Sequence, residues 1–149
     1  MDHLLDRGLT CVTVLDVSPT ALTRARTRLG ARAARAAWIE ADMTGEWHLS
    51  PVDIWHDRAV FHFLTTPVER DAYIAHLRCT LKIGGSAIIA TFGLEGPTLC
   101  SGLPVERYEP PGIAAILGPG FELAESFEDI HQTPTGGQQA FSFGRFIRR

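Results

Sequence analysis

The sequence of 149 residues lacks several features that mark particular classes of protein. It has no apolar run near the roughly 20 residues that a membrane span needs, and its first residues carry no cationic stretch typical of a secretory signal. Fourteen basic side chains stand against seventeen acidic ones, and a net charge of −3 gives no electrostatic footprint for nucleic acid. The three cysteines have no CxxC spacing, which predicts neither a disulfide framework nor a zinc site. We therefore expect a cytoplasmic protein that binds neither membranes nor nucleic acid and holds no metal.

The chain does contain enough apolar material for one core. Hydrophobic residues make up 45% of the sequence and recur along its whole length, which argues against disorder and fits one domain over residues 1–149. Glycine and proline divide the chain into alternating strand-like and helix-like segments, and two longer strand-like segments close it. This order predicts an α/β fold with an open, mostly parallel sheet and an antiparallel C-terminal hairpin.

The expected elements follow local signals. Short runs of apolar and β-branched residues predict strands at 11–15, 37–41, 53–56, 86–92, 121–131 and 139–148. Capping residues and helical periodicity predict helices at 3–7, 20–29, 67–81 and 112–117. Glycine and proline predict turns at 82–85 and 133–137, and a long loop or partial hairpin at 94–111.

Polar residues that directly follow strands are the first candidates for a site, because ligands of open α/β sheets bind at the carboxyl ends of strands. Asp16 follows the first strand, where a carboxylate can accept hydrogen bonds from a ribose diol. The alternative is a carboxylate that only benefits from the dipole of the next helix. Asp42 follows the second strand, where it can accept from an adenine amino group while Met43 packs on the ring; the alternative is an Asx turn before Thr44-Gly45.

The third strand ends in three polar residues, His56-Asp57-Arg58, and leads into an apolar stretch that contains His62. These side chains suit a substrate pocket or a site that orients a cationic group. The alternative is a surface pair of Asp57 and Arg58 that contributes little energy. His56 and His62 are the candidate general bases, although most histidines serve no catalytic role.

Four segments, in this order, resemble motifs of the class I S-adenosylmethionine-dependent methyltransferases. Residues 12–22, VTVLDVSPTAL, resemble the second motif, whose acid binds the ribose hydroxyls. Residues 40–43, EADM, resemble the third motif, whose acid meets the adenine amine. Residues 53–62, DIWHDRAVFH, are similar to the fourth motif, where the residue matched by Asp57 lies near the methionine end of the cofactor. Residues 81–85, LKIGG, resemble the turn usually written LKPGG, with Ile83 in the proline's place.

The resemblance implies a Rossmann-like fold, S-adenosylmethionine as cofactor and methyl transfer to a small-molecule acceptor. The cofactor-binding residues that it implies are Asp16, Val17, Asp42, Met43, Asp57 and Arg58. His56 and His62 are then the candidate bases for a hydroxyl acceptor. Two other readings stay open. One is a non-catalytic partner subunit or fragment with a methyltransferase-like fold. The other is an NAD-dependent oxidoreductase, which also places an acid after a strand but needs a GxGxxG loop that the sequence lacks.

The family's first motif, a strand followed by a glycine-rich GxGxG-like loop, has no counterpart in the sequence. In the family this strand is central, so the runs at 12–15 and 54–56 are expected to lose their shared neighbour and to keep unpaired edges. Three explanations are open: an N-terminally truncated chain, a sheet closed by direct re-pairing, and a sheet completed by another chain in a homo-oligomer. The first is favoured.

Overall fold

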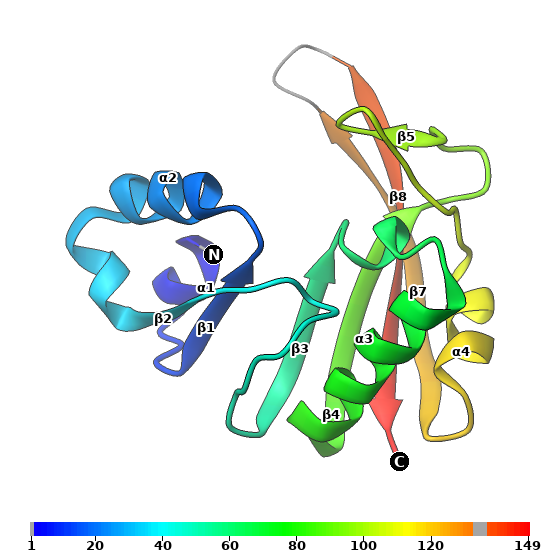
Figure 1. Ribbon diagram of the computed structural model, residues 1–149, viewed down its shortest axis with the longest axis horizontal. Helices are drawn as coiled ribbons and strands as arrows, with labels where there is room; N and C mark the ends of the chain where they lie inside the picture. The colour runs from blue at the N-terminus through cyan, green and yellow to red at the C-terminus, as the bar shows by residue number, and fades with distance from the viewer. Residues whose placement is uncertain (1, 133–136) are drawn as a thin grey trace. The chain divides into compact units, whose positions relative to one another are not determined.

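The computed structural model describes residues 2–132 and 137–149 and forms two compact units, Met1–His48 and Leu49–Arg149 (Figure 1). Each unit combines strands with helices, which confirms the expected α/β class. The single domain expected over residues 1–149 stays a prediction. Among the described residues, none of the helices has the length and apolar character needed to cross a membrane.

The first unit is a short parallel strand pair with helices around it. Its elements are α1 (Asp2–Asp6), β1 (Val12–Asp16), α2 (Pro19–Leu29), the 3₁₀ helix η1 (Gly30–Arg35) and β2 (Ala36–Glu40). As the sequence predicts, the Ser18 hydroxyl caps α2 by accepting from the Ala21 amide at 3.2 Å. β1 and β2 run parallel with Asp16 opposite Glu40, so both strands end at the same edge.

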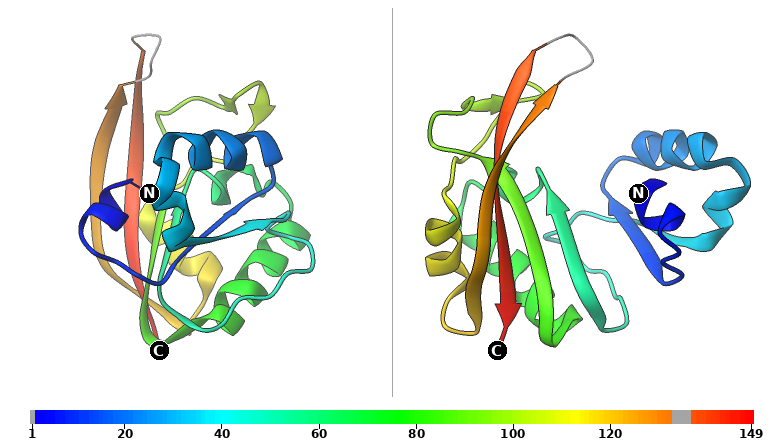
Figure 2. Two further views of the ribbon diagram at one scale, coloured as in Figure 1. Left: turned by 90° about the vertical axis from the view of Figure 1, so that its left-hand side faces the viewer. Right: turned by 180° about the vertical axis from the view of Figure 1, so that it is seen from behind.

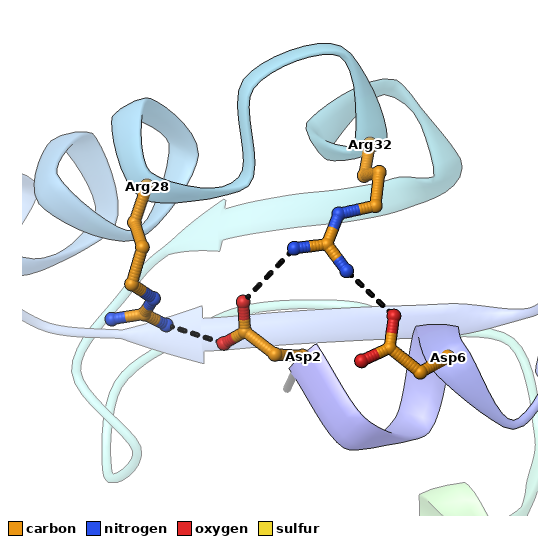
Figure 3. Close-up of polar contacts among 4 residues, drawn as sticks. All are labelled: Asp2, Asp6, Arg28 and Arg32. Atoms are coloured by element: carbon orange, nitrogen blue, oxygen red, sulfur yellow. Dashed lines mark hydrogen bonds and ion pairs between the residues drawn. The ribbon is translucent and has the colours of Figure 1, made fainter.

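Ion pairs connect α1 to the end of α2 and to η1 (Figure 3). The Arg28 guanidinium lies 3.0 Å from the Asp2 carboxylate, and Arg32 lies 3.4 Å from Asp2 and 2.6 Å from Asp6. All four side chains are substantially exposed, so solvent screens these pairs and they contribute little to stability. The buried apolar contact of α1 is Leu5, whose side chain is 1% exposed.

The second unit is a four-stranded sheet in the order β3-β4-β8-β7. Its elements are β3 (Val52–Arg58), the 3₁₀ helix η2 (Phe61–Phe63), α3 (Pro67–Thr80), β4 (Leu81–Phe92), β5 (Leu99–Cys100), β6 (Leu103–Pro104), α4 (Pro110–Leu117), β7 (Phe121–Gln132) and β8 (Gln138–Arg148). β3 and β4 are parallel, whereas β8 pairs antiparallel with β4 and with β7, which confirms the expected C-terminal hairpin. Of the predicted turn at 133–137, residues 133–136 lie outside the described residues.

α3 and α4 lie on one face of this sheet (Figures 1 and 2), where Arg78 of α3 donates to the Leu117 carbonyl at 3.0 Å. A capping box between Thr66 and Glu69 begins α3. Its buried side chains include Tyr73, Ile74 and Leu77, the apolar face that the helical spacing predicts. Leu81 was expected at the end of this helix, but it is the first residue of β4.

The predicted turn at 82–85, which contains Gly84 and Gly85, lies inside β4 and forms an irregular stretch of that strand. Val52 pairs with Leu81 and Ile54 with Ser86, so β4 advances five residues while β3 advances two. Gly84 adopts a left-handed φ of +77°, a conformation that favours glycine. At Gly85 an added Cβ would lie 2.8 Å from the Lys82 carbonyl oxygen and 3.0 Å from that of Asp53.

β1 and β3 are both edge strands in the part of the chain that the structure describes. β1 pairs with β2 alone and β3 with β4 alone, and the two belong to different sheets. This agrees with the expectation that both strands lack a neighbour. The three explanations for these edges stay predictions.

We expect Gly85→Ala to destabilise the protein by about 1–3 kcal/mol, because a new methyl group would clash with two backbone carbonyls. Urea unfolding followed by circular dichroism measures the loss. The matched control is Gly112→Ala in the first turn of α4, where an added Cβ meets no atom within 4 Å and alanine favours the helix. Equal unfolding midpoints for the two variants would contradict the expectation.

Candidate functional site

The two aspartates predicted to bind an adenosine lie at the same edge of the first unit. Asp16 is the last residue of β1, and Asp42 follows β2 by two residues. The Ala41 amide donates to the Asp16 carbonyl at 3.2 Å, which keeps the chain beside β1 past the end of β2. The parallel pairing therefore brings both carboxylates to the carboxyl ends of the strands.

Each of these carboxylates uses one oxygen locally. Oδ1 of Asp16 accepts from the Ser18 amide at 2.8 Å, and Oδ1 of Asp42 accepts from the amide and hydroxyl of Thr44 at 2.8 and 2.7 Å. The bonds from Thr44 hold the pKa of Asp42 below its usual value, so it is ionised at neutral pH. The Asx turn considered for Asp42 is thus present. The second oxygen of each aspartate accepts no hydrogen bond from the described residues and is open to a ligand.

An apolar side chain follows each aspartate. Val17 is 66% exposed, although it is apolar and comes directly after a strand. Met43 is half-buried, and its carbonyl accepts from the indole of Trp47 at 3.4 Å. Two carboxylate oxygens and two apolar side chains at one edge can bind a flat ring system that carries hydrogen-bond donors at its rim.

Asp57 in the second unit is buried and fully engaged. Its Oδ1 accepts from the Val60 amide at 2.9 Å, and its Oδ2 accepts from the Phe61 amide at 3.1 Å and the Tyr73 hydroxyl at 2.7 Å. Tyr73 in turn accepts from the Trp55 indole at 2.8 Å. Burial raises the pKa of Asp57 to about 6, although these hydrogen bonds act in the opposite direction. The surface ion pair considered for Asp57 is therefore wrong.

This carboxylate fixes the turn that carries His62. Ala59 has a left-handed φ of 67°, which is costly for a residue with a Cβ, and the next two amides donate to Asp57. His62 follows in η2 with 0% exposure, and burial lowers the pKa of its imidazole to about 4. Its ring is therefore neutral at pH 7.

His56 and Arg58 lie on the opposite face of β3 from Trp55 and Asp57, because side chains alternate along a strand. Both are exposed. The protein around His56 displaces solvent and lowers the pKa of its imidazole. The Arg58 guanidinium lies 4.9 Å from the centre of the Phe141 ring and makes no ion pair with the described residues.

The sequence analysis missed Tyr73 and Trp55 as parts of this arrangement. Tyr73 was expected only on the apolar face of α3, and nothing in the spacing shows that its hydroxyl meets a carboxylate. Within residues 2–132 and 137–149, no three His, Cys, Asp or Glu side chains are grouped so that they could hold a metal ion.

No family model matches the chain, and no curated protein matches its sequence. Solved structures do match. One comes from work on the conversion of a disulfide bond into a thioacetal group during echinomycin biosynthesis, with 22% identity and a TM-score of 0.78 over 98% of this chain and 70% of that one. The N-methyltransferase NodS from Bradyrhizobium japonicum, with S-adenosyl-L-homocysteine bound, has 18% identity and a TM-score of 0.68, with 91% of this chain and 65% of that one covered.

A third similar structure is the 1,6-didemethyltoxoflavin-N1-methyltransferase of Burkholderia thailandensis, with 17% identity and a TM-score of 0.70 over 99% of this chain and 65% of that one. The chain thus spans about two thirds of the length of these proteins. These similarities show that it has the fold of the class I S-adenosylmethionine-dependent methyltransferases.

The raised pKa of Asp57 predicts that the contribution of this carboxyl to the free energy of unfolding falls as pH rises. Its carboxyl has a usual pKa of 3.8 and a pKa of about 6 in the folded protein, so the folded state binds the proton more tightly. Between these values rising pH removes up to about 3 kcal/mol from the free energy of unfolding, at roughly 1.4 kcal/mol per pKa unit. Urea unfolding of wild type and of Asp57→Asn at several pH values from 4 to 7 measures this contribution. The variant has no ionisable group at position 57, so the difference between the two free energies of unfolding isolates the effect of the carboxyl.

Tyr73→Phe gives an independent check on the same carboxyl. The Tyr73 hydroxyl lowers the pKa of Asp57, so its removal is expected to move the midpoint of the pH effect upwards. A wild-type stability, relative to Asp57→Asn, that stays flat or rises over this pH range would contradict the assignment.

Proposed function

We propose that this chain binds the adenosine part of S-adenosylmethionine and serves methyl transfer to a small-molecule acceptor. The observation that carries the proposal is the pair of aspartates at the carboxyl edge of β1 and β2, each with one oxygen left open. The similarity to NodS with bound S-adenosyl-L-homocysteine and to the 1,6-didemethyltoxoflavin-N1-methyltransferase supports the choice of cofactor and of a small acceptor.

The open oxygen of Asp16 suits the two hydroxyls of a ribose, which donate side by side to one carboxylate. The open oxygen of Asp42 suits the exocyclic amine of adenine, and ionised Asp42 makes that hydrogen bond charge-assisted. Val17 and Met43 then pack against the base. Val17 is 66% exposed, so its side chain is accessible to an aromatic ring.

In the second unit, Arg58 has no acidic partner among the described residues, so its guanidinium suits the carboxylate of a small ligand. Asp57 was expected to contact the cofactor. Because both of its oxygens already accept hydrogen bonds, we assign it the role of holding the turn at 59–63. Asp57 is therefore a positioning residue in this proposal.

S-Adenosylmethionine supplies an electrophilic methyl group on a sulfonium when it is bound. The protein's part in such a displacement is to align the acceptor and exclude water, and no metal is needed. A neutral imidazole can accept the proton of a hydroxyl acceptor, and we propose His56 and His62 as the candidate bases. His62 is neutral at pH 7 and buried, whereas His56 is exposed on the sheet face.

Within the described residues, β1 and β3 each pair on one side only, which favours a second candidate function, a methyltransferase-like partner subunit without catalysis of its own. Exposed edge strands are templates for pairing with another chain. On this reading a homo-oligomer or another chain completes the sheet. An NAD-dependent oxidoreductase has no comparable support, because the sequence lacks GxGxxG.

Calorimetric titration with S-adenosyl-L-homocysteine tests the adenosine site directly. We expect Asp16→Asn and Asp42→Asn each to weaken binding roughly 10- to 100-fold, because each removes a charged acceptor worth about 1.5–3 kcal/mol. The matched control is Asp53→Asn, an exposed aspartate of β3 paired with Lys82, which is expected to bind like wild type. NAD serves as the control ligand.

Two outcomes would count against the proposal. Unchanged affinity in both variants would show that the ligand binds elsewhere. No heat from a folded, monodisperse wild-type protein would favour the partner subunit without catalysis.

A further inference from the structure

His62 stands out because it is buried without hydrogen bonds. Its side chain is 0% exposed, and among the described residues neither Nδ1 nor Nε2 has a partner. Buried polar groups in proteins are nearly always paired, so an exception calls for a missing partner or a functional reason. Neutral imidazole has one donor and one acceptor, and both are left unused here.

The surroundings of the imidazole are aromatic and carry no charge. Its ring centre lies 4.6 Å from that of Phe63 and 4.9 Å from that of Phe92. Phe92 belongs to a buried cluster with Ala90, Val105, Phe141 and Phe143. Burial alone lowers the pKa of His62, and no charged group contributes. A group that pairs with this ring must therefore enter an apolar environment and do so without a net charge.

The segment 93–108 is hydrogen bonded to the backbone of His62 and of Phe92. The Glu106 amide donates to the His62 carbonyl at 2.8 Å, and the Tyr108 amide donates to the Phe92 carbonyl at 3.0 Å. The segment is also bonded to itself, since the Val105 amide donates to the Thr98 carbonyl and Arg107 donates to the Leu94 carbonyl. A segment that holds its own shape can move away as a body when the few bonds at its base open.

We propose that the acceptor is a neutral, aromatic or largely apolar molecule whose hydroxyl or amino group hydrogen bonds to His62 beside the segment 93–108. The assignment of this ligand as a methyl acceptor rests on the proposed function. The binding itself depends only on residues of the second unit. Phe63 and Phe92 provide the apolar contacts, and the turn held by Asp57 keeps the imidazole in place.

The test follows the ring nitrogens of His62 by NMR in ¹⁵N-labelled wild-type protein without cofactor. Phenol and aniline are the probes with a hydroxyl and an amine, and toluene is the matched probe with neither. We expect phenol, aniline or both to shift the His62 ring nitrogens, and toluene to leave them in place. The ring of the exposed His48 in the same sample reports unspecific effects.

His62→Leu separates a binding role from a structural one. Leucine has a similar volume and no polar atoms, so we expect the variant to keep its fold and to melt a few degrees higher than wild type. In wild type and variant alike, backbone amide shifts of the second unit report how tightly each probe binds, and we expect the variant to lose the tighter binding of phenol or aniline relative to toluene. A lower Tm together with an unchanged preference would overturn the proposal.

The outcomes also separate this proposal from the proposed function. Shifts of equal size with toluene, or no shift with phenol and aniline, would overturn the role of His62, whatever the cofactor does. Loss of S-adenosyl-L-homocysteine binding in Asp16→Asn tests the other proposal.

Discussion

The buried carboxylate of Asp57 is the contact on which the functional end of the second unit depends. It joins the end of β3 to the amides of Val60 and Phe61 and to Tyr73 on α3. These donors replace part of the hydration that the carboxylate loses on burial, and they hold a turn that contains a left-handed alanine. Without this acceptor, the Val60 and Phe61 amides would lose their hydrogen-bond partner and the Tyr73 hydroxyl would keep only the Trp55 indole. The turn that leads to His62 would then lose two of its backbone bonds.

The helices could be predicted within one or two residues because their signals are local. Ser18 caps α2, and the spacing of Tyr73, Ile74 and Leu77 gives the buried face of α3. The irregular stretch in β4 could not be predicted. Glycines at 84 and 85 indicate a turn in the sequence, but whether they interrupt a strand or stay inside it depends on the pairing with β3, which is a tertiary contact.

The same division holds for the candidate site. Asp16 and Asp42 could be placed together because the carboxyl ends of parallel strands share an edge, whatever the details of packing. The buried positions of the Asp57 and His62 side chains could not be predicted. Their burial depends on how α3 packs on β3 and how the segment 93–108 folds back over Phe92, and the sequence pattern specifies neither. The surface pairing of Asp57 with Arg58, considered as the alternative to a ligand role, is wrong because adjacent residues in a strand point to opposite faces.

The local bonds of Asp16 and Asp42 also affect how a ligand would be bound. Each carboxylate is held through Oδ1 by the residues that follow it, so its orientation is set before any ligand arrives. Binding then costs little side-chain entropy at these two positions, and more of the interaction energy appears as affinity. A small edge of only two strands can in this way present a preorganised pair of acceptors, with the geometry specified by short stretches of sequence.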